Sequence, residues 1–142
     1  MSRPTDRTEI EALLERLKQA HHDKDAAASA AEYADPVIYN LAPPLKVEGG
    51  VETLAEWFKT WAGPVEVENR DFQILVGEDL AFAHGFQHVS AVTKDGGDHA
   101  AWWMRTTFGL RRIEGAWKVV HEHSSVPFYM DGSFKAAIDL EP

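Results

Sequence analysis

The main change in the spacing of apolar residues in this chain falls at Gly63-Pro64, and that change restricts the folds open to it. Before this point, apart from a short strand predicted over 37–41, apolar residues recur every three or four positions, which is typical of amphipathic helices. After it they alternate with polar residues, as Val65 and Val67 do around Glu66, which is typical of strands with one buried face. Helices at the start followed by a meander of strands predict an α+β domain in which a curved antiparallel sheet packs on three helices.

Capping and turn residues predict where these elements begin and end. Thr8 and Glu11 have the spacing of a capping box at the start of the first helix. The slip of phase at Asn69-Arg70-Asp71 predicts a bulge in a long strand, and the glycines in the loops 94–98 and 113–116 predict hairpins. The other helices are expected over 25–33 and after Gly49-Gly50, with Trp57 and Trp61 on one helical face, and the strands over 37–41, 65–76, 80–92, 100–112 and 117–127.

Composition excludes several classes of function. The 142 residues include 14 basic and 23 acidic side chains, for a net charge of −9, and no cysteine. We therefore expect no disulfide, no thiolate nucleophile, no nucleic-acid partner and no binding to anionic membranes. No apolar stretch reaches the ~20 residues of a membrane span, and the first residues lack a signal peptide's apolar core, so a cytoplasmic location is expected. The length predicts one domain over 1–142, with its core over about 8–127 and a tail over 128–142.

Three motifs carry a family resemblance: Tyr33-Ala-Asp-Pro, Gly49-Gly-Val-Glu-Thr-Leu, and residues 105–127, which end in Trp-Lys-Val-Val-His-Glu-His-Ser-Ser-Val-Pro. With the order of elements, they resemble the nuclear transport factor 2-like superfamily, and within it the SnoaL-like and ketosteroid-isomerase-like proteins. The last motif is also similar to the association domain of calmodulin-dependent kinase. The resemblance implies a cone-shaped fold with an internal pocket and a homodimer through the outer face of the sheet.

The ketosteroid isomerase reaction itself is not expected. The positions that correspond to that enzyme's tyrosine, base and oxyanion acid are Leu17, Leu41 and about Thr106. A leucine cannot accept a proton, and a threonine is a weak donor compared with a protonated carboxylic acid.

Strand alternation predicts which side chains line the implied pocket. If Gly115 is left-handed in a three-residue loop, Arg112 pairs with Ala116 and Thr106 lies opposite Glu122. The even-numbered residues of the last three strands then share the pocket face. They are Phe82, His84, Phe86, His88, Trp102, Met104, Thr106, Phe108, Val120, Glu122, Ser124 and Val126, with Tyr39, Leu41, Trp57 and Trp61 closing the pocket.

The acid–base candidates on that face are Glu122 and His84, with His88 as a second histidine. A turn of two or four residues would instead bring Arg105 to the face of Glu122, so Arg105 is a further ligand candidate. The predicted ligand-binding residues are Tyr39, Trp57, Trp61, Phe86, His88, Trp102, Met104, Thr106, Ser124 and Arg105. The same aromatic residues can instead form an ordinary core.

Two functions follow from this face. The first is cofactor-independent isomerisation, dehydration or cyclisation of a small ketone- or polyketide-like compound. The second is a non-catalytic ligand-binding or oligomerisation module. No cofactor is expected, since the chain has no phosphate-cradling loop. No metal is expected either, because His121-x-His123 has no third ligand at a diagnostic spacing.

Overall fold

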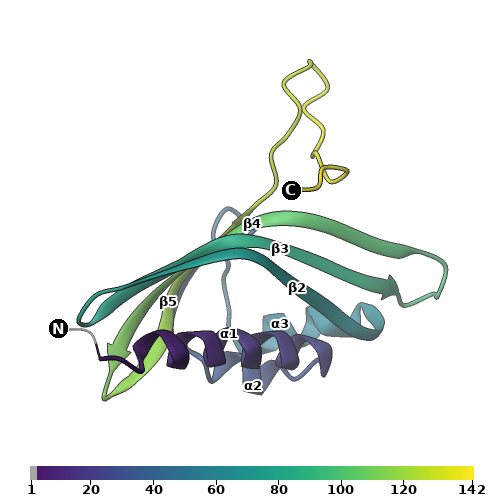
Figure 1. Cartoon of the computed structure of the whole chain (residues 1–142). Coiled ribbons are helices and arrows are strands. Elements are labelled where there is room, and N and C mark those ends of the chain that lie inside the picture. The colour runs from purple at the N-terminus through teal and green to yellow at the C-terminus, as the bar shows by residue number, and fades with distance from the viewer. Residues whose placement is uncertain (1–2) are drawn as a thin grey trace.

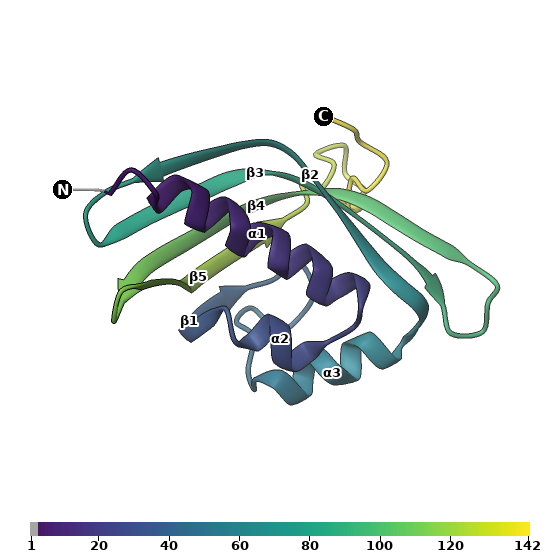
Figure 2. The same ribbon diagram turned by 60° about the horizontal axis from the view of Figure 1, so that its bottom comes forward.

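The computed structural model describes residues 3–142 and contains three helices against the concave side of a five-stranded sheet (Figures 1 and 2). The helices are α1 (Asp6–His22), α2 (Ala26–Ala30) and α3 (Val51–Lys59). The strands are β1 (Tyr33–Tyr39), β2 (Trp61–Val76), β3 (Leu80–Thr93), β4 (His99–Ile113) and β5 (Ala116–Ser125), in the order β1-β5-β4-β3-β2. The α+β prediction is confirmed, with one difference: β1 runs parallel to β5, while the other pairs are antiparallel.

Several boundaries differ from the sequence prediction. β1 runs over Tyr33–Tyr39 rather than 37–41, so Tyr33 belongs to this strand and not to the second helix. α1 begins at Asp6, so Thr8 and Glu11 lie inside the helix and form no capping box. α2 is only five residues long; the Asp25 carboxylate caps it by accepting a hydrogen bond from the Ala28 amide at 3.0 Å. α3 ends at Lys59, and Trp61 is the first residue of β2 rather than a residue of the helix.

The predicted bulge in β2 is present. The pairing with β3 shifts between Arg70 and Gln73, and Asp71 has a positive φ of 56°. Because the extra residue reverses the alternation, the inward-facing residues are odd-numbered before the bulge and even-numbered after it.

The β4–β5 hairpin has a two-residue turn, so the predicted three-residue loop is wrong. Glu114 and Gly115 both have positive φ, and Ile113 pairs with Ala116. A bulge at Val120 then moves the register by one residue. Beyond that bulge the even-numbered residues of β4 and β5 do share the concave face, although Thr106 lies opposite Ser124 and not Glu122.

The prediction that the even-numbered residues of β3 face the helices is wrong. Thr93 donates its amide proton to the Asp98 carbonyl at 2.9 Å, which leaves four residues in the loop between β3 and β4. With an even-numbered loop, paired residues have opposite parity, as Ala83 with Phe108 and Gln87 with Met104. The odd-numbered residues of β3 therefore face the helices, and Phe82, His84, Phe86 and His88 face outward.

Two apolar clusters fill the space between sheet and helices. The first lies under α1 and is built from Ile10, Leu13, Leu14, Leu17, Ala81, Ala83, Phe108, Leu110, Trp117 and Val119, with Tyr33 and Phe72 at its border. The second lies under α3 and is built from Ala26, Phe58, Val65, Val89 and Ala91, with Trp57, Trp61, Trp102 and Met104 at its border.

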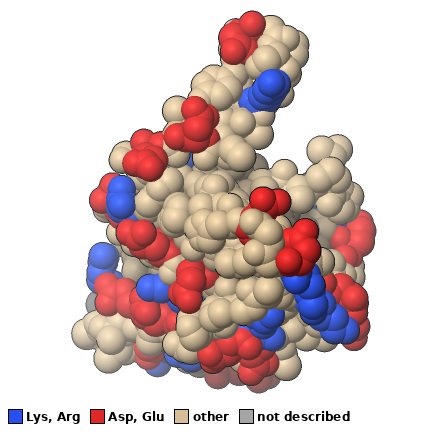
Figure 3. Space-filling view, turned by 90° about the vertical axis from the view of Figure 1, so that its right-hand side faces the viewer, with Lys and Arg blue, Asp and Glu red and all other residues tan. Residues whose placement is uncertain are grey.

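After β5 the chain leaves the sheet and forms an arm that projects from the body of the molecule on the side opposite the helices (Figures 1 and 3). Among residues 3–142, no helix has the length and apolar character needed to cross a membrane.

Candidate functional site

A row of hydrogen-bonded polar side chains crosses the concave face of the sheet between the two apolar clusters. The Gln87 amide nitrogen donates to Asn69 Oδ1 at 2.9 Å, and the Thr106 hydroxyl donates to Gln87 Oε1 at 2.9 Å. The hydroxyls of Thr106 and Ser124 are 3.4 Å apart. With the neighbouring pair of Tyr33 and Glu122, these residues form what we call the polar belt: Tyr33, Asn69, Gln87, Thr106, Glu122 and Ser124.

The belt occupies positions where the strands otherwise present apolar residues. On β4, Thr106 lies between Met104 of the second cluster and Phe108 of the first. Thr106 is 1% exposed, so its hydroxyl is buried and requires a partner. Packing alone would be served by an apolar side chain at this position, and the belt is therefore a candidate for a functional site.

Glu122 and Tyr33 form the most perturbed pair of the belt. β1 lies parallel to β5 and directs the Tyr33 hydroxyl to Glu122 Oε1, to which it donates a short hydrogen bond. Burial raises the pKa of Glu122, while the Tyr33 hydrogen bond and the nearby His121 lower it by less. Burial, with the charge of Glu122 as the next cause, raises the pKa of Tyr33 well above its ordinary value. A carboxyl group with a raised pKa exchanges protons closer to neutral pH than an exposed one does.

Tryptophan residues lie on the side of the belt towards α3. The rings of Trp57 and Trp61 meet edge to face at 5.9 Å, although the two residues belong to different elements. Among the described residues, the indole nitrogens of Trp61 and Trp102 are buried and have no hydrogen-bond partner. A buried donor left unpaired costs about 1–3 kcal/mol, so a bound molecule with acceptor oxygens would gain by pairing with them.

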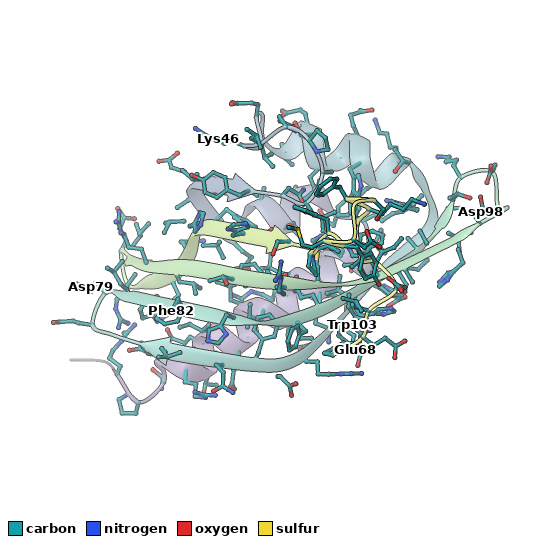
Figure 4. All side chains as sticks on the ribbon, turned by 90° about the horizontal axis from the view of Figure 1, so that it is seen from above. Lys46, Glu68, Asp79, Phe82, Asp98 and Trp103 are labelled. Carbon is teal, nitrogen blue, oxygen red and sulfur yellow. The ribbon has the colours of Figure 1, made fainter. Side chains whose placement is uncertain are left out.

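Five of the predicted site residues face away from the belt, on the outer face of the sheet, where Figure 4 shows Phe82 and Trp103. His84 stacks on Phe82 at 5.9 Å, and His88 lies 4.9 Å from Trp103. The five predicted site residues on the outer face are His84, Phe86, His88, Arg105 and Tyr39. The prediction that His84 and Glu122 form a pair is therefore wrong, because the sheet separates them.

The contacts of Arg105 and Tyr39 belong to the outer face. Arg105 Nε donates to the Ser125 hydroxyl at 3.2 Å. The Tyr39 ring lies 5.2 Å from the His121 ring and 5.6 Å from the His123 ring. The His121 ring also forms a hydrogen bond to the Val37 carbonyl at 2.7 Å, so these histidines have partners on β1.

The remaining predicted residues do lie on the concave side of the sheet, between the sheet and the helices. They are Glu122, Trp57, Trp61, Trp102, Met104, Thr106 and Ser124. Tyr33, Asn69 and Gln87 were missed as site residues. Asn69 and Gln87 could have been found from the alternation of their strands. Asn69 follows Val65 and Val67 on the inward face of β2, and Gln87 precedes Val89 on the inward face of β3, so each is a polar residue at a position expected to be apolar.

Two surface hollows lie elsewhere. One, of about 530 Å³, is on the outer side of the sheet near the β2–β3 turn and is lined by Leu75, Val76, Gly77, Leu80, Ala81, Phe82, Gly109, Leu110 and Val120. The other, of about 210 Å³, lies between α1 and α2 beside the ion pair of Arg16 and Glu32. No belt residue lines either hollow.

Comparison with solved structures shows the same architecture in other proteins. An NTF2-like protein of unknown function from Pseudomonas putida KT2440 is 34% identical, with 95% of each chain covered and a TM-score of 0.80. At 14% identity, a proposed scytalone dehydratase from Novosphingobium aromaticivorans DSM 12444 has a TM-score of 0.75, with 84% of this chain and 83% of that one covered. At 22% identity, a proposed calcium/calmodulin-dependent protein kinase II association domain from Xanthomonas campestris has a TM-score of 0.69, with 88% and 91% covered. The last two likenesses show the fold alone.

The sequence family is also clear. A search of curated proteins finds no match to the chain. The family model of the SnoaL-like domain matches residues 10–129, which include every residue of the polar belt. The chain therefore belongs to the SnoaL-like family, within the nuclear transport factor 2-like superfamily.

Proposed function

We propose that this protein binds a small, mostly apolar organic molecule on the concave face of its sheet, where Glu122 transfers a proton in a cofactor-independent reaction. The observation that carries the proposal is the partly buried Glu122 carboxyl group, whose pKa desolvation raises, with the Tyr33 hydroxyl bonded to it. Reactions of this class are isomerisation, dehydration and cyclisation of ketone-like compounds.

The presence of a partly buried carboxyl group at Glu122 is not explained by its contribution to stability. Desolvation disfavours its charged form, and a buried polar pair is on average no more stabilising than well-packed apolar residues. The neighbouring inward residue of β5, Val119, is fully buried and apolar, so the local packing accepts such a side chain. The cost of Glu122 is explained if its proton is used in chemistry.

The walls beside the belt support a flat ligand with oxygen functions. The rings of Trp57, Trp61 and Trp102 offer aromatic faces, and two of their indole nitrogens are unpaired donors. A carbonyl or ether oxygen on an aromatic or alicyclic skeleton satisfies both features.

α3 is the wall best suited to admit the ligand. Phe58 is the one fully buried residue of this helix. The helix is joined to β1 by the largely exposed loop 40–50. Segments with few buried side chains open at the lowest free-energy cost, so we expect α3 and this loop to move when the ligand enters.

The experiment measures the pKa of Glu122 and the binding of two probes, the ketone 2-tetralone and the phenol 1-naphthol. In ¹³C NMR, the Glu122 carboxyl should titrate above the ordinary value for glutamate, and Tyr33→Phe should raise its pKa further, because the mutation removes the bond that favours the carboxylate. Quenching of tryptophan fluorescence should report binding of 2-tetralone and 1-naphthol. Glu52→Gln, on the exposed first turn of α3, is the matched control for Glu122→Gln.

Stability against pH gives an independent readout. Because burial raises the folded-state pKa of Glu122, the folded protein holds this proton at a pH where the unfolded chain has lost it. Wild-type stability should therefore fall relative to Glu122→Gln as pH rises above about 4.3, the ordinary value for glutamate. An ordinary pKa together with no binding of either probe would refute the proposal. Binding that survives Glu122→Gln, with no proton exchange at the ketone's α-carbon in the wild type, would favour the non-catalytic module instead.

A further inference from the structure

The arm that follows β5 is a small hairpin with its own hydrogen bonds. Phe128 and Ala136 form an antiparallel bridge, the Tyr129 amide donates to the Lys135 carbonyl at 2.8 Å, and the Ala137 amide donates to the Pro127 carbonyl at 2.8 Å. The Tyr129 hydroxyl also donates to the Asp139 carboxylate. We call residues 127–140 the C-terminal arm; its shape is defined, and Figure 3 shows it standing clear of the domain.

The C-terminal arm exposes large apolar side chains that its own fold does not cover. Met130 is 82% exposed and Phe134 is 65% exposed. The full set is Phe128, Met130, Phe134, Ile138 and Leu140, five of the large exposed apolar residues of the described chain. The rings of Phe128 and Phe134 meet edge to face with their centroids 5.8 Å apart, and exposed apolar side chains gathered on one small element mark an interaction site.

The outer face of the sheet has a matching apolar surface. The hollow of about 530 Å³ is lined there by Leu75, Leu80 and Phe82, each about half exposed, together with Val120. The arm rises on this same side of the sheet, opposite the helices (Figure 1). Figure 4 looks down on the face and shows Phe82 on it.

The charges of the two surfaces do not oppose their contact. The arm and the residue after it carry Asp131, Asp139 and Glu141 against one Lys135. On β2, β4 and β5 the outward-facing charged residues are Arg70, Arg105, Arg111 and Lys118 against Glu66, Glu68 and Asp71, and β1 adds the exposed Asp35. This face is therefore close to neutral in a chain whose net charge is −9, and it repels an acidic arm less than an acidic surface would.

We propose that the C-terminal arm clasps the outer sheet face of a second copy of this chain, and that the second copy's arm clasps the first in return. The hairpin holds the arm away from its own sheet, so its apolar residues are presented to another molecule (Figure 1). In a two-fold pair with facing sheets, both arms and both hollows lie between the copies, and each arm reaches its partner's face. The homodimer expected from the family resemblance would thus be fastened by an element that the resemblance did not include.

The first test is the oligomeric state, measured by sedimentation equilibrium. The double variant Met130→Asp with Phe134→Asp should weaken self-association at least 100-fold, and Phe82→Asp on the opposing surface should do the same. The control is Leu45→Asp, since Leu45 is 96% exposed but lies in the loop 40–50, away from both surfaces. Circular dichroism checks that each variant is folded. A wild-type chain that stays monomeric at 100 µM, or a dimer unaffected by the arm variant, would overturn the proposal.

The second test locates the arm. The chain has no cysteine, so Met130→Cys and Phe82→Cys can each be made as single-thiol proteins. A short bis-maleimide linker should join the two variants when they are mixed, and the joined species should be absent with Leu45→Cys in place of Phe82→Cys. If the linker instead closes only within one chain that carries both thiols, the arm folds onto its own sheet and the proposal fails.

Discussion

Thr106 provides the sharpest test of the polar belt, because valine has nearly the same shape as threonine but no hydroxyl. The Thr106 hydroxyl donates to Gln87 Oε1 at 2.9 Å and lies 3.4 Å from the Ser124 hydroxyl, at 1% exposure. Thr106→Val creates no cavity, so its effect measures the hydrogen bond alone. A buried acceptor left unpaired costs about 1–3 kcal/mol of unfolding free energy.

Thr107 is the matched control, because it is the next residue on the same strand and is exposed on the outer face. Thr107→Val should change the unfolding free energy by less than about 0.5 kcal/mol. The assay is urea unfolding followed by tryptophan fluorescence. Thermal unfolding should show a midpoint roughly 2–12 °C lower for Thr106→Val, because a loss of about 1–3 kcal/mol lowers the midpoint by about 2–4 °C per kcal/mol in a chain of this size.

The double variant Thr106→Val with Gln87→Met separates the bond from the general effect of each substitution. With both partners apolar, the Gln87 acceptor no longer exists to be left unpaired, so the double variant should lose less stability than the sum of the two single losses. Equal stability of Thr106→Val and Thr107→Val would refute the assignment of Thr106 to a buried, hydrogen-bonded belt.

Two further predictions concern acid stability and packing. The bidentate bond from Arg112, at 2.8 Å to each oxygen, holds the pKa of Asp6 well below its ordinary value. The ion pair stabilises the folded protein fully above about pH 4, and this stabilisation is lost as pH falls through the lowered native pKa of Asp6. The difference in unfolding free energy between the wild type and Asp6→Ala, measured by urea unfolding, should therefore become smaller below about pH 4. A difference that does not change with pH would contradict this account. Gly85→Ala places a Cβ 2.9 Å from the Phe72 backbone and should lower the thermal midpoint, whereas Gly97→Ala, with its nearest atom at 3.4 Å, should not; equal midpoints would count against the close approach.

The periodicity of apolar residues was sufficient to predict the order of helices and strands and the position of one β-bulge. Apolar spacing predicted the helices followed by long strands, and the phase slip at Asn69-Arg70-Asp71 predicted the bulge in β2. Both signals are local, because a helix repeats every 3.6 residues and a strand every two. The family resemblance also rests on local motifs of adjacent residues, and the match to the SnoaL-like family model confirms it.

Apolar spacing could not predict which residues of a strand point towards the helices and which point outward. On β5 the predicted loop was one residue too long, and the bulge at Val120 compensated, so Glu122 faces inward as expected. On β3 the loop error had no compensation, and His84 and His88 were placed on the wrong side. A shift of one residue reverses every side chain of a strand, so small differences in loops decide which residues can share a site.

What the sequence determined by itself is the class of fold, the family and the inward position of Trp102, Thr106 and Phe108 on β4. Only the tertiary structure decided that Tyr33 bonds to Glu122, 89 residues further along the chain. It also decided that the histidines of β3 lie outside and that the C-terminal arm stands apart from the domain. The physical reason is the same in each case: a local pattern shows that a strand has two faces, but pairing between distant strands sets which residues meet on each face.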